Sequence, residues 1–392
     1  MKIIKKLLCI CLSAILALCI LPVVSFAEND TTLKFGADGK FKIVMFADSQ
    51  DDENLEATTT QLMNEALDTY KPDLVVFLGD NTVAQGEEKQ YEAIKAVTEP
   101  CVSRNVPYAI VFGNHDQEQG VEKEVLLEMY QEFGCLTYDA APAIHGCGSC
   151  NLPVYSSDGS KMAMNLWLID SNSSHPDDPS VGGYEIVYED QIEWYKATSE
   201  AIKAANGGVA VPSFNFQHIV VPEVYDALGC PAVPRLKTGA YPYMGKSYIP
   251  VPNPAKYTGL MCEHPCPPYS PDGQLDAWLE EGDVIASFFG HDHTNTFTTW
   301  SNGIALTTVP SVGCNSYSSD ITRGVGLLTV DENDVENYSY ELIKMYDMAL
   351  ADGSQLTKVD GGKSSIYYRF VKFFAEFIET AIHAFAAMPI GK

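Results

Sequence analysis

The chain has 392 residues, of which 46% are hydrophobic and 20% are charged, with 52 acidic side chains against 25 basic ones. This is enough apolar material for one large layered domain with insertions. The formal net charge of −27 argues against nucleic acid and anionic lipid as bulk partners. A small phosphorylated substrate is still compatible with this charge, because bound metal ions would invert the local field.

Residues 1–27 have the pattern of an export signal. Three lysines precede an apolar run over residues 7–24, and Ser25, Phe26 and Ala27 then supply a suitable cleavage site. We expect this segment to be removed and the protein to be secreted or exposed at the cell surface. An uncleaved membrane anchor is the alternative reading.

Three of the 11 cysteines lie in residues 1–27, which leaves eight. An even number in an exported protein favours disulfides or free structural thiols over a zinc site or a redox pair. The sequence does not determine which cysteines pair. The eight are Cys101, Cys135, Cys147, Cys150, Cys230, Cys262, Cys266 and Cys314.

Short apolar runs alternate with helical patterns along the chain, which is typical of a layered α/β fold. Proline at position 100 predicts a break or bend in the second helix. We expect strands at 41–47, 74–78, 108–112, 162–169, 213–217, 284–289 and 304–309, and helices at 56–70, 87–104, 189–205 and 274–281.

Two regions depart from this alternation and define the expected domain organisation. Residues 222–271 are rich in Pro and Tyr and predict an irregular insertion within a domain spanning 28–350. This insertion either forms a wall of the substrate pocket or is a surface feature without a substrate role. Its candidate substrate contacts are Arg235, Lys237, Tyr241, Tyr243 and Tyr248.

Residues 351–392 predict a polar linker followed by an amphipathic helix over 367–387. The helix carries ionisable residues of both signs, which argues against a membrane span and does not favour a membrane surface. We expect its apolar face to pack on the main domain or on a second subunit, and the oligomeric state stays open.

Polar residues follow five of the predicted strands, at the carboxyl ends where α/β folds place their sites. Carboxylates and imidazoles are ligands of divalent first-row metals. Single motifs of this kind are common turns, whereas five in one chain indicate a metal site. The motifs are Asp48-Ser49-Gln50, Gly79-Asp80-Asn81, Gly113-Asn114-His115-Asp116, Gln217-His218 and Gly290-His291-Asp292-His293.

In this order the motifs resemble those of the calcineurin-like metallophosphoesterases, over roughly residues 42–295. The family pattern is D-x-H, G-D, G-N-H-D/E, a single H and then G-H-x-H. The segments VFGNHDQE, HIVVPE and FFGHDHTN are similar to the branch related to purple acid phosphatases. The resemblance implies a four-layer αββα sandwich with a binuclear metal centre between the two sheets.

The resemblance also implies roles for the motif residues. Two divalent ions (Mn, Zn, Fe or Mg) would supply a bound hydroxide that attacks a phosphate ester. His115 would be the general acid, and Asp116 would orient its imidazole. The first ion would be held by Asp48, Gln50, Asp80 and His293, and the second by Asp80, Asn114, His218 and His291, with Asp80 bridging.

Two positions depart from the family pattern. Gln50 stands where His is usual and is a weaker ligand, so the first metal is expected to bind less tightly. Val83 stands where purple acid phosphatases have the tyrosine that gives their colour, so Fe(III) is not implied. Asp292 is expected to be a solvated or supporting carboxylate rather than a third ligand.

We therefore expect a secreted hydrolase of phosphate esters, with phosphomonoesters preferred. A phosphodiesterase acting on nucleotides or wall polymers is one alternative. The other is a binding protein that has the same fold and no activity, for which Gln50 would be the sign.

Overall fold

The computed structural model describes residues 31–174, 183–233, 241–243, 246–351, 353–356, 363 and 365–386. The expected export signal lies outside the described residues, as do Arg235 and Lys237. Residues 31–392 form one compact unit, which contains all the elements below.

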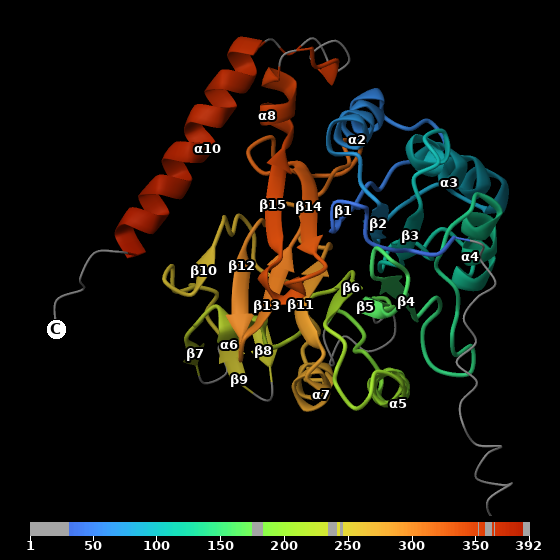
Figure 1. The fold of residues 1–392 in the computed structure, drawn as a ribbon. Coiled ribbons are helices and arrows are strands. Elements are labelled where there is room, and N and C mark those ends of the chain that lie inside the picture. Colours follow the sequence, from blue (N-terminus) through green and yellow to red (C-terminus); the bar gives the residue numbers. More distant parts are fainter. Residues whose placement is uncertain are drawn as a thin grey trace, which may run out of the picture. The chain divides into compact units, whose positions relative to one another are not determined.

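Two sheets form the centre of this unit (Figure 1). The first has five strands in the order β15-β14-β1-β2-β3. Its parallel strands β1, β2 and β3 all end at one edge, while β14 and β15 run antiparallel beside them. The strands are β1 (Lys40–Phe46), β2 (Leu74–Leu78), β3 (Tyr108–Val111), β14 (Gly324–Asp331) and β15 (Ser339–Lys344).

The second sheet has seven strands in the order β10-β12-β13-β11-β6-β5-β4. Its central strands β5, β6, β11 and β13 are parallel. A separate three-stranded sheet of β7 (Ala232–Val233), β8 (Tyr241–Tyr243) and β9 (Lys246–Tyr248) lies within the predicted insertion. The large sheet contains β4 (Cys150–Tyr155), β5 (Met162–Leu168), β6 (Ser213–Gln217), β10 (Tyr257–Thr258), β11 (Val284–Phe289), β12 (Thr298–Ser301) and β13 (Ile304–Thr308).

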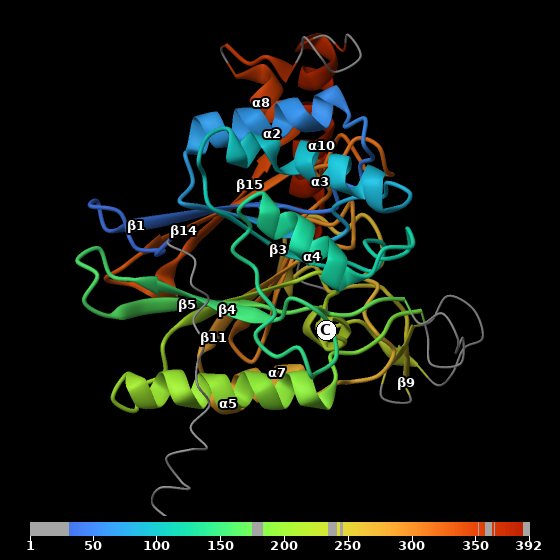
Figure 2. The ribbon, with the colours of Figure 1, turned by 90° about the vertical axis from the view of Figure 1, so that its right-hand side faces the viewer.

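Helices cover the outer face of each sheet, so the unit has four layers (Figure 2). The helices α2 (Ala57–Tyr70), α3 (Glu87–Val102) and α4 (Lys123–Glu132) cover the first sheet. The helices α5 (Glu189–Ala205) and α7 (Gln274–Glu281) cover the second. The expected αββα architecture is therefore confirmed. The shorter elements are α6 (Val224–Ala227), η1 (Val335–Asn337) and α8 (Met345–Leu350), and α10 (Ser365–Ala386) is the last helix.

Strand β1 shows why its sequence suits this central position. Successive side chains of a strand point to opposite faces. Val44 and Phe46 are buried toward the helices, whereas Ile43 and Met45 are buried in the apolar cluster between the two sheets. A third cluster, which includes Trp167 and Trp278, lies between the second sheet and its helices. Each sheet is covered on both faces, so the strands are apolar runs rather than alternating ones.

The predicted elements are found close to their expected bounds, with one correction. Helix α3 runs through Pro100 and ends at Val102, so the proline does not break it. Pro100 lies in the last turn, where the lost backbone N–H affects only the end of the helix. Sequence reasoning missed α4, β4, β12, β14 and β15.

Helix α10 packs on α8 through Tyr368, Val371 and Ala375, which are buried in the first apolar cluster. Ion pairs join Lys344 to Glu379 and Asp347 to Lys372 along this contact. Among the helices of the described residues, none is long and apolar enough to cross a membrane.

Candidate metal centre

The carboxyl ends of strands from both sheets meet at one place. Asp48 follows β1, Asp80 follows β2, Asn114 follows β3, and His218 and His291 follow β6 and β11. The Nδ1 of His218 donates to the carbonyl oxygen of Leu78 at 2.7 Å, which ties the second sheet to the first. All five side chains are buried.

The backbone at these strand ends is strained. Asp48, Gln50, Asp80 and His291 have φ angles of 50°, 39°, 50° and 69°. Residues with side chains rarely adopt this left-handed region, and it concentrates at functional sites. With this backbone conformation, the side chains that follow the strands point into the space between the sheets.

Two glycines of the motifs are required by close approach rather than by a turn alone. A Cβ at Gly113 would lie 2.1 Å from Oδ1 of Asp80, and one at Gly79 would lie 2.6 Å from Nδ1 of His218. Side chains at either position would displace a residue of the centre. The glycines of the G-D and G-N-H-D motifs therefore make room for the centre.

The side chains that meet here form two groups that could each hold an ion. Asp80, His218 and His291 offer ligand atoms within 4.8 Å of one another, and so do Asp48, Asp80 and His293. Asp80 belongs to both groups, as the expected bridging role requires. The ligand roles themselves stay predictions.

The directions of the histidine lone pairs also indicate that these side chains could hold cations. His218 and His293 use Nδ1 to donate to the carbonyl oxygens of Leu78 and Tyr317, both at 2.7 Å. Their Nε2 atoms therefore direct lone pairs at carboxylate oxygens, 3.1 Å from Asp80 and 3.4 Å from Asp48. Two acceptors at such distances repel unless a proton or a metal ion lies with them.

Further buried acceptors at the same place lack a partner in the described part of the chain. They are Oδ1 of Asn114 and Nε2 of His291. A buried polar atom without a partner costs free energy, and a metal ion would satisfy both. The residues present therefore fit the two ions that the resemblance implies.

The pKa values of His218 and His291 differ, because the two rings meet different charges in the centre. Burial acts to lower the pKa of His218, but the Asp80 and Asp48 carboxylates raise it to about 9. Burial and the charge on His218 lower the pKa of His291 to about 3. The carboxylates thus favour the protonated form of His218, whereas His291 stays neutral.

Gln50 lies at the centre but presents its nitrogen to Asp80. Its Nε2 donates to Oδ2 of Asp80 at 3.0 Å, and an amide nitrogen cannot bind a cation. Gln50 would have to turn its amide over to coordinate the first metal through oxygen. In the arrangement described, it supports the bridging carboxylate by a hydrogen bond.

His115 stands at the mouth of the centre, and its partner is not the expected one. Its Nδ1 lies 2.5 Å from Oε2 of Glu118, while its backbone N–H donates to Oδ1 of Asp80 at 2.8 Å. The ring is about half-exposed and so accessible to a substrate. Glu118 is therefore the residue that orients the imidazole.

The expectation that Asp116 orients His115 is wrong. The buried Asp116 carboxylate accepts backbone N–H groups instead, from Gly113 at 2.7 Å, Asn81 at 2.8 Å and Asp80 at 3.0 Å. Burial and the Asp80 charge raise the pKa of Asp116 to about 6. Asp116 therefore joins the turns that follow β2 and β3. The carboxylate that reaches the His115 ring is that of Glu118, two residues further along the chain.

A segment that sequence reasoning missed closes one side of the centre. Tyr317 stacks on His293 with the ring centroids 4.0 Å apart, and its hydroxyl donates to Glu263 at 3.1 Å. Glu263 also accepts from the backbone N–H of Thr294 at 2.6 Å. Tyr317 has no motif around it, so only its position in space reveals the contact.

The end of the insertion supports this loop, and of its three candidate tyrosines only Tyr248 has a described side chain. Asp292 is buried rather than solvated, and its Oδ1 accepts from the backbone N–H of Cys266 at 3.1 Å. Burial, followed by the charge of Glu263, raises the pKa of Asp292 to about 8. Tyr248 is a core residue that bonds to Asp226 at 2.7 Å, so its proposed substrate contact is wrong.

A cavity of about 280 Å³ opens beside the centre. Gln50, Val83, His115, Asn315 and Ser316 line it. Val83 therefore lies where a substrate would bind, and its apolar side chain offers no phenolate to a metal. Asn315 and Ser316 come from the same missed segment as Tyr317.

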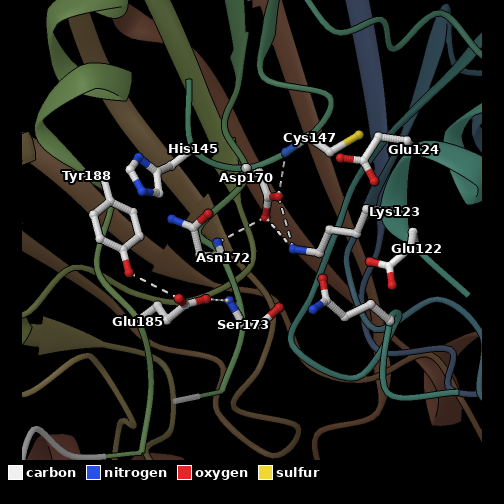
Figure 3. A pocket seen from close by; sticks show the side chains of 12 residues that line it. Glu122, Lys123, Glu124, His145, Cys147, Asp170, Asn172, Ser173, Glu185 and Tyr188 are labelled. Carbon is white, nitrogen blue, oxygen red and sulfur yellow. Dashed lines mark hydrogen bonds and ion pairs between the residues drawn. The ribbon is translucent and has the colours of Figure 1, made fainter. Parts of the chain in front are cut away.

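A second, polar pocket of about 200 Å³ lies at the carboxyl end of β5 (Figure 3). At its base the Lys123 ammonium reaches both carboxylate oxygens of Asp170 at 2.9 Å (Figure 3). Asp170 also accepts from the backbone N–H groups of Cys147 and Asn172, both at 2.9 Å. This buried pair joins the start of α4 to loops of the second sheet. The sequence singled out neither residue.

Five of the eight cysteines outside the export signal are buried free thiols, namely Cys101, Cys135, Cys147, Cys150 and Cys230. Burial raises the pKa of the Cys101 and Cys150 thiols, which makes them unreactive structural residues. This agrees with the structural-thiol reading of the sequence.

Comparison with known proteins now bears on this geometry. Residues 41–204 match the family model described as calcineurin-like phosphoesterase. Two relatives from Arabidopsis thaliana, named probable inactive purple acid phosphatase 29 and 14, are each 25% identical. The first match covers 81% of this chain and 83% of the relative, and the second covers 73% of each. A solved dimetal phosphatase from Danio rerio is similar with a TM-score of 0.44 and 14% identity, over 74% of this chain and 92% of that one.

Residues 41–204 are therefore similar to the calcineurin-like phosphoesterase family, and the chain is similar over most of its length to proteins named as purple acid phosphatases. The matched segment contains Asp48, Asp80 and Asn114, whereas His218, His291 and His293 lie beyond it. The fold brings both sets together, as the geometry above describes.

Proposed function

We propose that the protein is a secreted, metal-dependent phosphoesterase that prefers phosphomonoesters. The observation that carries the proposal is the shared carboxylate of Asp80, toward which Nε2 of His218 directs a lone pair at 3.1 Å. Such an arrangement is stable when cations lie between the groups. Secretion is supported by the sequence of residues 1–27.

Asp48, Asp80 and His293 would hold one ion, and Asp80, Asn114, His218 and His291 the other. Bound there, the ions neutralise the phosphate and activate water. The chain's own residues perform the remaining work. His115 can donate a proton to the leaving oxygen, with Glu118 fixing its ring through Nδ1. Val83, Asn315 and Ser316 bound the space beside it.

The test is hydrolysis of p-nitrophenyl phosphate and bis-p-nitrophenyl phosphate by the purified protein. It is run after chelation and again after addition of Mn, Zn, Fe or Mg. Replacing His218 by Ala removes a ligand from inside the centre. His145→Ala is the matched control, because His145 is exposed and pairs with Asp190 outside the centre.

We expect metal-dependent turnover that is lost in His218→Ala and kept in His145→Ala. Faster hydrolysis of the monoester supports the stated preference, and faster hydrolysis of the diester replaces it with a phosphodiesterase. Equal turnover in both histidine variants contradicts the proposed centre.

A binding protein without activity is the second candidate, and two observations favour it. Gln50 turns its amide nitrogen to Asp80, and the relatives above carry the word inactive in their names. Under this candidate the protein binds metal, measured by calorimetry, but hydrolyses neither ester. Gln50→His would then restore turnover by supplying the usual nitrogen ligand.

A further inference from the structure

Helix α10 has apolar side chains on two sides, although its contacts within the chain cover one. Tyr368, Val371 and Ala375 face the apolar cluster of the first sheet. A second stripe is exposed, and we name it the phenylalanine face. It consists of Ile366, Phe370, Phe373, Phe374, Phe377 and Ile378, whose exposed fractions are 77%, 61%, 63%, 40%, 61% and 37%.

The spacing of these residues places them on one continuous side of the helix. Their rings contact one another along it, with centroids 4.6 Å apart for Phe370 and Phe374 and 6.4 Å apart for Phe373 and Phe377. Figure 1 shows α10 at the margin of the folded unit, with α8 beside it. The phenylalanine face is therefore a formed surface rather than scattered residues.

The area of the phenylalanine face is large for an isolated protein. A buried Phe covers 150–250 Å², so the exposed parts of the four rings amount to roughly 450 Å². With the two isoleucines the face is at the upper end of exposed apolar patches, which are about 300–600 Å². Two such faces in contact would bury about 1,000 Å², which is what a specific interface needs.

The charges beside the face suit a second copy of the same helix. Lys372 and Glu379 pair within the chain, with Asp347 and Lys344. Arg369 and Glu376 are exposed and two turns apart on the same flank, and Glu376 also lies 3.7 Å from Lys372 of its own helix. In an antiparallel pair of α10 helices, Arg369 of each copy comes opposite Glu376 of the other.

The same register pairs the apolar residues. The two-fold axis passes between residues 372 and 373, so Phe370 of one copy lies beside Phe373 of the other, within the same helical turn. We propose that α10 is a dimerisation helix, whose phenylalanine face packs antiparallel on the same face of a second copy. The contact is isologous, so it closes as a two-fold dimer and leaves no face free to continue into a fibre.

The charge pattern favours this occupant over a membrane. Helices that lie on membranes carry lysines and arginines along the polar face, whereas the flank here alternates Arg369 with Glu376. The net charge of −27 also opposes approach to an anionic lipid surface.

The test is the molar mass of the purified protein in solution, measured by sedimentation equilibrium from about 1 to 100 µM, a range that brackets micromolar association. We expect a dimer for the natural chain. Phe373→Glu with Phe377→Glu should give a monomer, because each copy would bring two carboxylates into the interface. Circular dichroism checks that the variants stay folded.

A charge exchange provides a test that does not disturb the apolar face. Arg369→Glu places like charges opposite each other twice in each dimer, so the dissociation constant should rise about tenfold. Adding Glu376→Arg to the same chain should restore it. Lys34→Glu, an exposed charge change outside α10, should leave the dimer unchanged.

A monomer at 100 µM overturns the proposal, as does a dimer that survives the two Phe→Glu changes. Failure of Glu376→Arg to restore the Arg369→Glu dimer overturns the antiparallel register. A monomer that sediments with phosphatidylcholine–phosphatidylglycerol vesicles shows that lipid is the occupant instead. None of these results depends on phosphoesterase activity.

Discussion

The buried pair of Lys123 and Asp170 makes a quantitative prediction about stability. Replacing Asp170 by Asn leaves the Lys123 ammonium without a countercharge in a place where its side chain is 6% exposed and that of Asp170 is 0% exposed. Removing one partner of such a pair costs about 3–5 kcal/mol. The same change also weakens the acceptor for the backbone of Cys147 and Asn172.

The assay is equilibrium unfolding in urea, followed by circular dichroism and by tryptophan fluorescence. Asp170→Asn should lower the free energy of unfolding by at least about 3 kcal/mol without changing the m-value. Lys123→Met should cost less, because the carboxylate keeps the two backbone donors. The double variant should recover about 1 kcal/mol or more relative to the sum of the single changes.

The matched control is Glu280→Gln, which breaks the exposed pair of Lys196 and Glu280 on helices α5 and α7. Their side chains are 36% and 65% exposed, so the loss should stay within about 1 kcal/mol. If Asp170→Asn costs no more than this control, the buried pair does not hold the loops at the carboxyl end of β5, and the reasoning fails.

Four further predictions concern the metal centre. Gly113→Ala should abolish metal uptake, measured by mass spectrometry of the metal content, because its Cβ would lie 2.1 Å from Asp80; uptake at the natural level would contradict the packing argument. His115→Ala should lower kcat by about 100-fold or more with an alkyl phosphate and much less with p-nitrophenyl phosphate, whose leaving group needs no proton; equal losses would rule out a general acid. Glu118→Gln should lower kcat less than His115→Ala and shift its pH profile, whereas no effect would mean that Glu118 does not orient the ring. Because the proton on His218 must leave before a metal binds, metal affinity by calorimetry should rise with pH up to about 9. A metal affinity that stays flat between pH 6.5 and about 9 would contradict this protonation of His218.

Much of the fold is written into the sequence, because strands covered on both faces are continuous apolar runs. The segment LVVFL became β2 with the expected bounds. The segment SFNFQ, in which polar and apolar residues alternate, also became β6 with the expected bounds. Strands β14 and β15 were missed because β14 is interrupted by Gly326 and β15 is polar and half-buried at the sheet edge. An edge strand of this kind is identified by the strand that it pairs with, and its own composition does not reveal it.

The sequence likewise predicted some residues of the candidate metal centre and missed others. Asp80, Asn114 and His291 could be found from sequence because each follows a strand within a glycine motif, whose glycine leaves room for the neighbouring ligand. The partner of His115 could not be found so. Asp116 is its neighbour in sequence, yet the turn directs that carboxylate inward to four backbone N–H groups.

Tertiary structure alone decided three features. They are the contact of Tyr317 with His293, the contact of Lys123 with Asp170, and the exposure of the phenylalanine face. Each depends on segments far apart in the chain, or on what covers a helix after folding. The sequence by itself determined which side chains of metal-ligating type follow the strands, because residue type and strand context are local. Packing decided how those side chains are oriented, which residues support them and how accessible they are. These properties depend on distances between segments, and the order of residues does not contain those distances.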